Sequence, residues 1–79
     1  MDTMESDGIR ARIEKDIAMF DASAASVNAA DEAQRKVVEM SKLYAKDSRS
    51  YLEKGDYYTS FSCISYAHGL LDAIKSLLE

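Results

Sequence analysis

The sequence predicts an all-α fold, an up-down-up antiparallel bundle of three helices in a single domain over residues 1–79. Two observations predict this fold. Apolar residues recur at intervals of three and four in three separate stretches, as they do on the buried side of a helix. The chain also has no proline and only three glycines, which is too little turn chemistry for a β-rich fold. We therefore expect helices near residues 6–27, 32–53 and 57–78, with connections short enough to make neighbours antiparallel.

The first expected helix, residues 6–27, carries a narrow apolar stripe. Its members are Ile9, Ile13, Ile17, Phe20, Ala24 and Val27. We expect Asn28 to end this helix in a left-handed conformation, which asparagine adopts more readily than most residues. Asp31 and Gln34 then form a capping-box pattern, which indicates that the next helix begins near residue 32.

The second expected helix, residues 32–53, is the most clearly amphipathic of the three. Its expected buried side carries Ala33, Val37, Met40, Tyr44, Tyr51 and Leu52. Its opposite side carries Glu32, Arg35, Lys36, Glu39, Lys42, Lys46, Arg49 and Glu53. The segment Lys54-Gly55-Asp56 indicates, in order, a helix end, a left-handed glycine and the N-cap of a new helix.

The third expected helix, residues 57–78, has a broad apolar arc that should contact two neighbours. The arc consists of Tyr57, Phe61, Cys63, Ile64, Ala67, Leu70, Leu71, Ile74, Leu77 and Leu78. If this helix packs antiparallel to the second about Gly55, residues whose numbers sum to about 110 lie level with one another. Asp47 is then level with about residue 63, and we expect Cys63 to be buried and chemically inert.

Charge and composition exclude several classes of function. The net charge is −4, and no three basic residues are consecutive, which argues against binding nucleic acid or an anionic membrane. No apolar run reaches the ~18–20 residues of a membrane span. One cysteine excludes an internal disulfide. The acidic, polar start of the chain lacks the features of a secretory signal, so we expect a cytoplasmic protein.

Few residues are candidates for chemistry. His68 and Asp72 are four residues apart on one helix edge and could form half of a metal site, but the chain has no second histidine to complete it. The simpler interpretation is a surface histidine hydrogen-bonded to the Asp72 carboxylate. Asp47 and Asp72 would lie about 14 Å apart along the bundle, which is too far for a paired acid and base. We expect no catalytic residue, no metal and no cofactor.

The most informative feature is a row of small residues on the third helix, opposite its apolar arc. The row and its flanking side chains, which together form the candidate interaction surface, are Tyr58, Ser62, Ser65, Tyr66, Gly69, Asp72, Ala73 and Ser76. A solvated helix face normally carries charged residues, as the second helix does. Gly69 in the middle of a helix costs about 1 kcal/mol relative to alanine, so a compensating contact is expected.

Residues 44–74 carry a family resemblance. The turn Lys54-Gly55-Asp56, together with the stretch from Tyr66 to Ala73, resembles the archaeal domain-of-unknown-function family 357, whose members are short helical proteins. The resemblance implies a three-helix bundle, which agrees with the periodicity. It implies no activity, because the family has no assigned function, and it supplies no catalytic residues.

Three function classes remain. The sequence favours a non-enzymatic interaction module that forms a homodimer or docks on a larger protein partner through the third helix. The alternative is a small-molecule or nucleotide-binding domain that uses the tyrosine-flanked face around Gly69. An enzyme is least favoured, because no nucleophile–base pair or metal cluster is present in the sequence.

Overall fold

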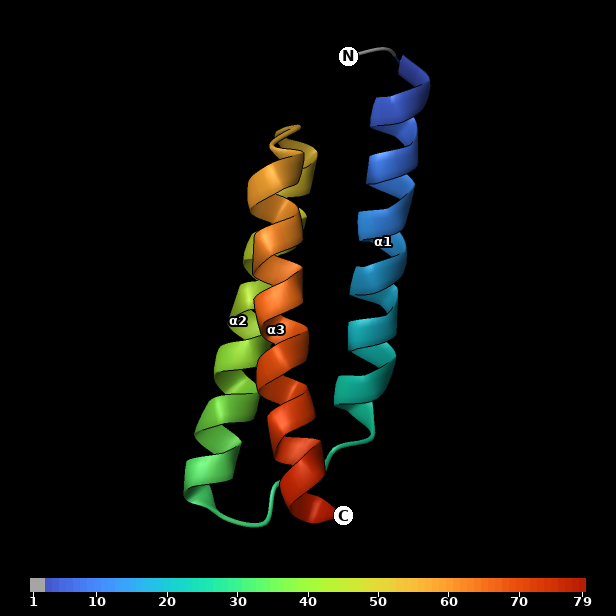
Figure 1. Ribbon diagram of the computed structural model, residues 1–79. Coiled ribbons are helices and arrows are strands. Elements are labelled where there is room, and N and C mark those ends of the chain that lie inside the picture. Colours follow the sequence, from blue (N-terminus) through green and yellow to red (C-terminus); the bar gives the residue numbers. More distant parts are fainter. Residues whose placement is uncertain (1–2) are drawn as a thin grey trace.

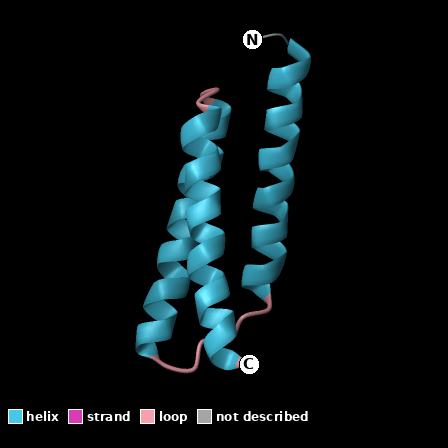
Figure 2. Ribbon diagram, viewed as in Figure 1, coloured by secondary structure: helices cyan, strands magenta, loops and turns pink. Residues whose placement is uncertain are grey.

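The computed structural model describes the backbone of residues 3–79 and the side chains of residues 7–79. It contains three helices: α1 (Thr3–Ala25), α2 (Glu32–Glu53) and α3 (Tyr57–Leu78). Figure 1 shows that consecutive helices run in opposite directions, so that α1 and α3 are parallel. No strand occurs between residues 3 and 79, as Figure 2 also shows. The expected all-α, three-helix fold is confirmed.

The limits of α1 differ from those expected. The helix begins at Thr3 and ends at Ala25, two residues before the predicted end. The expectation of a left-handed Asn28 is wrong, because no described residue other than glycine has a positive φ. The last turn is instead closed by short-range bonds, since the Ser26 amide and hydroxyl both donate to the Ser23 carbonyl, at 3.2 and 2.9 Å. Such tightened turns satisfy the free carbonyls at a helix end.

The start of α2 is fixed by the predicted cap. The Gln34 amide donates to Asp31 Oδ1 at 2.8 Å, and the Gln34 side chain accepts from the Ala30 amide at 2.9 Å. In a capping box the Gln34 side chain would accept from the amide of Asp31. Here it accepts from the amide of Ala30, the residue before Asp31. The first bond satisfies an amide that the first turn of the helix leaves free, and the second fixes the chain just before the cap.

The connection between α2 and α3 is also as predicted. Gly55 has a φ of +80°, the left-handed region that glycine adopts without steric cost. Asp56 caps α3 by accepting from the Thr59 amide at 3.1 Å. The hydrogen bonds from Thr59 lower the pKa of the Asp56 carboxyl, because they stabilise its charged form.

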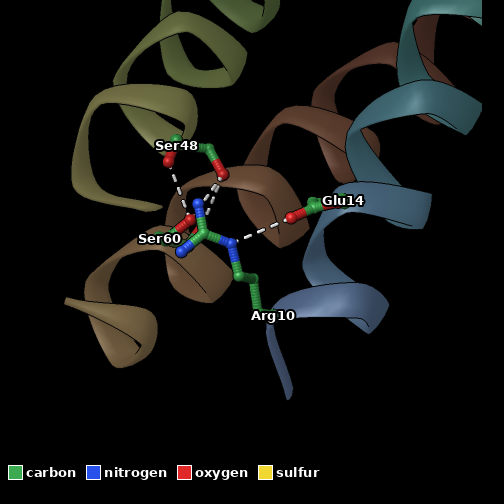
Figure 3. A network of polar contacts seen from close by, with 4 residues as sticks. All are labelled: Arg10, Glu14, Ser48 and Ser60. Atoms are coloured by element: carbon green, nitrogen blue, oxygen red, sulfur yellow. Dashed lines mark hydrogen bonds and ion pairs between the residues drawn. The ribbon is translucent and has the colours of Figure 1, made fainter. Parts of the chain in front are cut away.

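The interface between α2 and α3 is built on small residues. Ser48 Oγ donates to the Ser60 carbonyl at 2.8 Å, and Ser60 Oγ donates to the Ser48 carbonyl at 2.7 Å (Figure 3). Both serines are fully buried. The numbers 48 and 60 sum to 108, close to the predicted register of about 110. Hydrogen bonds from a side chain to the opposite backbone require the two helices to lie close together.

The buried side of α2 is rotated from the one expected. Its buried residues are Val38, Ser41, Ala45, Ser48 and Leu52. Of the residues predicted there, Met40 and Ala33 are exposed, and Val37, Tyr44 and Tyr51 are half-buried beside the interface. The close approach of α3 explains the difference, because only small side chains fit between the two helices where Ser48 meets Ser60. The larger ones cover the edge of the interface.

Helix α1 packs against this α2–α3 pair through larger side chains. The core residues are Ile13, Ile17, Phe20, Ala24, Val38, Ala45, Leu52, Ile64, Ala67, Leu71 and Ile74. Two polar contacts join α1 to α3: His68 Nε2 donates to the Asp16 carbonyl, and Lys75 Nζ donates to Ser23 Oγ, each at 2.9 Å. In both pairs the residue numbers differ by 52, which gives the register of the two parallel helices. An ion pair between Arg49 and Asp21 joins α1 to α2.

Candidate interaction surface

The row of small residues on α3 is open to solvent. All eight residues of the candidate surface are exposed: Tyr58, Ser62, Ser65, Tyr66, Gly69, Asp72, Ala73 and Ser76. A Cβ atom added to Gly69 would meet no heavy atom within 4 Å. Ser62 Oγ donates to the Tyr58 carbonyl on its own helix, at 3.0 Å. Within the monomer, therefore, no neighbouring backbone requires a glycine at position 69.

The two tyrosines beside this row differ in how much they contact the rest of the monomer. Tyr66 packs against Tyr44 of α2, with ring centroids 4.6 Å apart and planes inclined by 57°. Tyr58 is 85% exposed. A tyrosine at that exposure contributes little to the stability of the monomer, although it offers a large contact area to a partner.

The outward face of α3 carries very little charge. Between Tyr57 and Leu78, the formally charged side chains are Asp72 and Lys75, and Lys75 is engaged with Ser23 of α1. The outward face of α2, in contrast, is lined by basic and acidic residues, two of which form the ion pair Lys42–Glu39. The two helices have the same number of residues, so the difference in charge between their outward faces does not arise from a difference in length.

The environment of His68 differs from both interpretations of the sequence. The ring is half-buried, its Nε2 binds the Asp16 carbonyl, and it packs edge-on against Phe20 with centroids 5.7 Å apart. The expected bond to Asp72 is therefore wrong, because the ring turns inward to α1 and Asp72 points to solvent. Within residues 7–79, no three histidine, cysteine or carboxylate side chains lie close enough to hold a metal ion.

Cys63 is half-buried, so the expectation of full burial is wrong. Its burial raises the pKa of the thiol, and the negative charges of Asp47 and Asp56 raise it further. The effect of Asp47 agrees with its predicted position level with residue 63. A raised pKa leaves less of the reactive thiolate at neutral pH.

We therefore expect Cys63 to react slowly with a thiol reagent such as Ellman's reagent. The rate at about pH 7.5 should be at least about tenfold lower in the native protein than in denaturant, because the thiol is less accessible and less ionised. Asp47→Asn should raise the native rate, since it removes one of the charges that oppose ionisation. Equal rates in native and denatured protein would contradict this prediction.

A shallow cleft lies beside the candidate surface, between the first half of α1 and the start of α3. It has a volume of about 410 Å³ and is lined by Gly8, Ile9, Arg12, Ile13 and Phe61. Ile9 belongs to the apolar stripe of the first helix, and Phe61 belongs to the arc of the third. That both remain partly exposed on one face is not predicted by the sequence, because it depends on how α1 and α3 are placed.

The fold and this surface define a class of small helical bundle with one solvent-exposed helix face that carries little charge. The chain belongs to the family described as "Protein of unknown function (DUF357)", whose model matches residues 11–78. The match includes most of α1 as well as all of α2 and α3. No curated protein matches the chain. Within the described residues, no helix is both long and apolar enough to cross a membrane.

Proposed function

We propose that this protein is a non-enzymatic interaction module of the cytoplasm that forms a homodimer through the exposed face of α3. The observation that carries the proposal is the space above Gly69. A residue that weakens its own helix by about 1 kcal/mol relative to alanine lies where an added Cβ atom would meet no heavy atom of the monomer within 4 Å. If the backbone of a partner packed on this face, it would leave no room for a side chain at position 69, and the glycine would be required there.

The character of the face supports this proposal. Its exposed serines and alanine are short, so a second helix can approach closely and gain contact along its whole length. Tyr58 and Tyr66 stand beside them and can cover the edges of such a contact at a small cost in side-chain entropy. A dimer would also add buried area to a domain whose size limits its core. A larger protein with a complementary helix is the other partner that this face fits.

Gly69→Gln tests the proposal. We expect the substitution to abolish the dimer, because the long side chain would occupy the space needed by the partner. It should also stabilise the isolated fold by about 0.5 kcal/mol, since glutamine favours a helix more than glycine does. Light scattering after size exclusion gives the mass, and urea unfolding followed by circular dichroism gives the stability.

Ser50→Gln provides a matched control. Ser50 is exposed on α2, away from the face, so this substitution should leave the mass unchanged. If Gly69→Gln stabilises the protein and the dimer persists, the interface lies on another face. If instead only a larger host protein binds, and Gly69→Gln blocks that binding, self-association is wrong and docking on that partner replaces it.

A further inference from the structure

We propose that a second copy docks antiparallel across the combined face of α1 and α3, with Arg12 of each copy paired to Asp72 of the other. This arrangement rests on the self-association proposed above. It specifies the register of the dimer, the second helix that takes part and the charges that orient it.

The face extends beyond α3 because α1 lies beside it. On α1, Met19 is 54% exposed and Ile9 is 37% exposed. On α3, Phe61 is 43% exposed next to the cleft that it forms with Ile9. The two parallel helices therefore present a broad surface with exposed apolar groups, which is the composition found at the centre of protein interfaces.

Two opposite charges on this face form no ion pair within the part of the monomer that the structure describes. Arg12 and Asp72 are both exposed, and neither forms an ion pair with a described residue, whereas four other pairs are present. Lys15, one turn further along α1, is also exposed and forms no such pair with the described part of the chain. The positive charges thus lie on α1 towards one end of the face, and the negative charge lies on α3 towards the other.

The register places these charges symmetrically. The offset of 52 between α1 and α3, taken from the His68–Asp16 and Lys75–Ser23 contacts, makes Arg12 level with residue 64. Asp72 is eight residues further along, or about 12 Å at 1.5 Å per residue. The midpoint lies at residue 68, next to Gly69. Two antiparallel copies related by a two-fold axis at this level would therefore bring Arg12 of each copy level with Asp72 of the other.

The same two-fold axis explains the position of the glycine. It passes through the one place on α3 where no side chain separates the backbones, so the two α3 helices can cross closely there. Because a two-fold axis repeats every contact, the dimer contains the Arg12–Asp72 pair twice. Lys15 lies on the Arg12 side of the axis and adds to the positive charge that meets Asp72.

The area of the chain is consistent with this contact. The protein exposes 5288 Å², whereas a typical monomer of 8.8 kDa exposes about 4,800 Å². The excess follows from the elongated shape, with extents of 46 × 18 × 15 Å. Pairing two such rods side by side would bury part of one long flank on each copy. A standard interface buries roughly 800 Å² per partner, and a flank of this length is large enough to supply it.

Charge reversal gives a sharp test, because the two variants should complement each other. In an Arg12→Glu dimer two acidic residues would face each other at both ends, and in an Asp72→Arg dimer two basic ones would do so. We expect each variant alone to raise the dimer Kd at least about tenfold. Sedimentation velocity measures the Kd of each variant and of their mixture.

An equimolar mixture of the two variants should recover the dimer, with a Kd within about threefold of the wild-type value. The heterodimer pairs the introduced glutamate with the introduced arginine at one end, and it keeps the native Arg12–Asp72 pair at the other. Opposite charges therefore meet at both ends again. If the mixture fails to recover the dimer, the pairing of these two residues is wrong.

The control is the pair Lys46→Glu and Asp47→Arg on α2, whose native residues are exposed and lie off this face. Neither variant nor their mixture should change the Kd, and circular dichroism should show all variants to be equally helical. If the wild type dimerises and Arg12→Glu and Asp72→Arg leave the Kd unchanged, this docking arrangement is wrong and self-association stands. A monomeric wild type would overturn both proposals.

Discussion

Ser48→Leu is expected to lower the free energy of unfolding by about 3–5 kcal/mol, a large part of the total for a domain of this size. Ser48 is fully buried between α2 and α3, and its hydroxyl donates to the Ser60 carbonyl. Leucine would remove this bond and push the helices apart, which would also break the bond from Ser60 Oγ to the Ser48 carbonyl. Urea unfolding followed by circular dichroism measures the loss.

Two further variants separate overpacking from the loss of the hydroxyl. Ser48→Ala keeps the helices close and leaves the bond from Ser60 intact, so it should cost only about 1 kcal/mol. Ser50→Leu, at an exposed position two residues away, should change stability by less than about 0.5 kcal/mol. If Ser48→Leu were no worse than Ser48→Ala, the close approach of the two helices would be contradicted.

Phe20→Ala should have an effect of similar size, about 3–5 kcal/mol. Phe20 is 1% exposed and packs against His68, so it fixes the C-terminal half of α1 on α3. Its removal would enlarge a neighbouring cleft of about 280 Å³ between α1 and α2. Hydrogen exchange should show that amides in α1 lose more protection than those in α2 and α3, because the serine-linked pair retains its own contacts.

Leu43→Ala is the control for Phe20→Ala, because Leu43 is 61% exposed on α2. It should cost less than about 0.5 kcal/mol. A uniform loss of protection across all three helices in Phe20→Ala would show that the bundle unfolds as one unit. That result would contradict the expectation that α2 and α3 stay paired when the packing of α1 is weakened.

The helix limits that depend on local signals could be predicted from the sequence. Asp31, Gly55 and Asp56 act within a few residues of themselves, through caps and a left-handed glycine, and the structure places the ends of α2 and the start of α3 where they indicate. The end of α1 has no such strong signal. Asn28 is compatible with a left-handed cap, but Ser26 closes the helix earlier.

Contacts between distant segments could not be predicted in the same way. The sequence offers His68 a carboxylate four residues away, whereas its actual partner is a carbonyl on α1. The prediction for the buried side of α2 is wrong for a related reason, because hydrophobicity favours Met40 and Tyr44 over Ser41 and Ser48. The serines are buried because α3 approaches closely, which no pattern within α2 reveals.

The candidate surface, too, could be predicted from the sequence only in part. The exposure of Ser65, Gly69 and Ala73 follows from their position opposite the apolar arc of one helix. The contribution of α1, through Arg12 and Met19, depends on the register between two helices that are distant in the sequence. The combined face could therefore be identified only from the structure.

The mass of the wild-type protein in solution tests the central claim most directly. Multi-angle light scattering at increasing protein concentration should give a mass that approaches twice 8.8 kDa, because two copies are proposed to cover the α3 face. A mass that stays at 8.8 kDa up to about 500 µM would mean a Kd weaker than roughly 10 mM, because a Kd of about 1 mM would already place more than a third of the chains in dimers at that concentration. That result would contradict the homodimer.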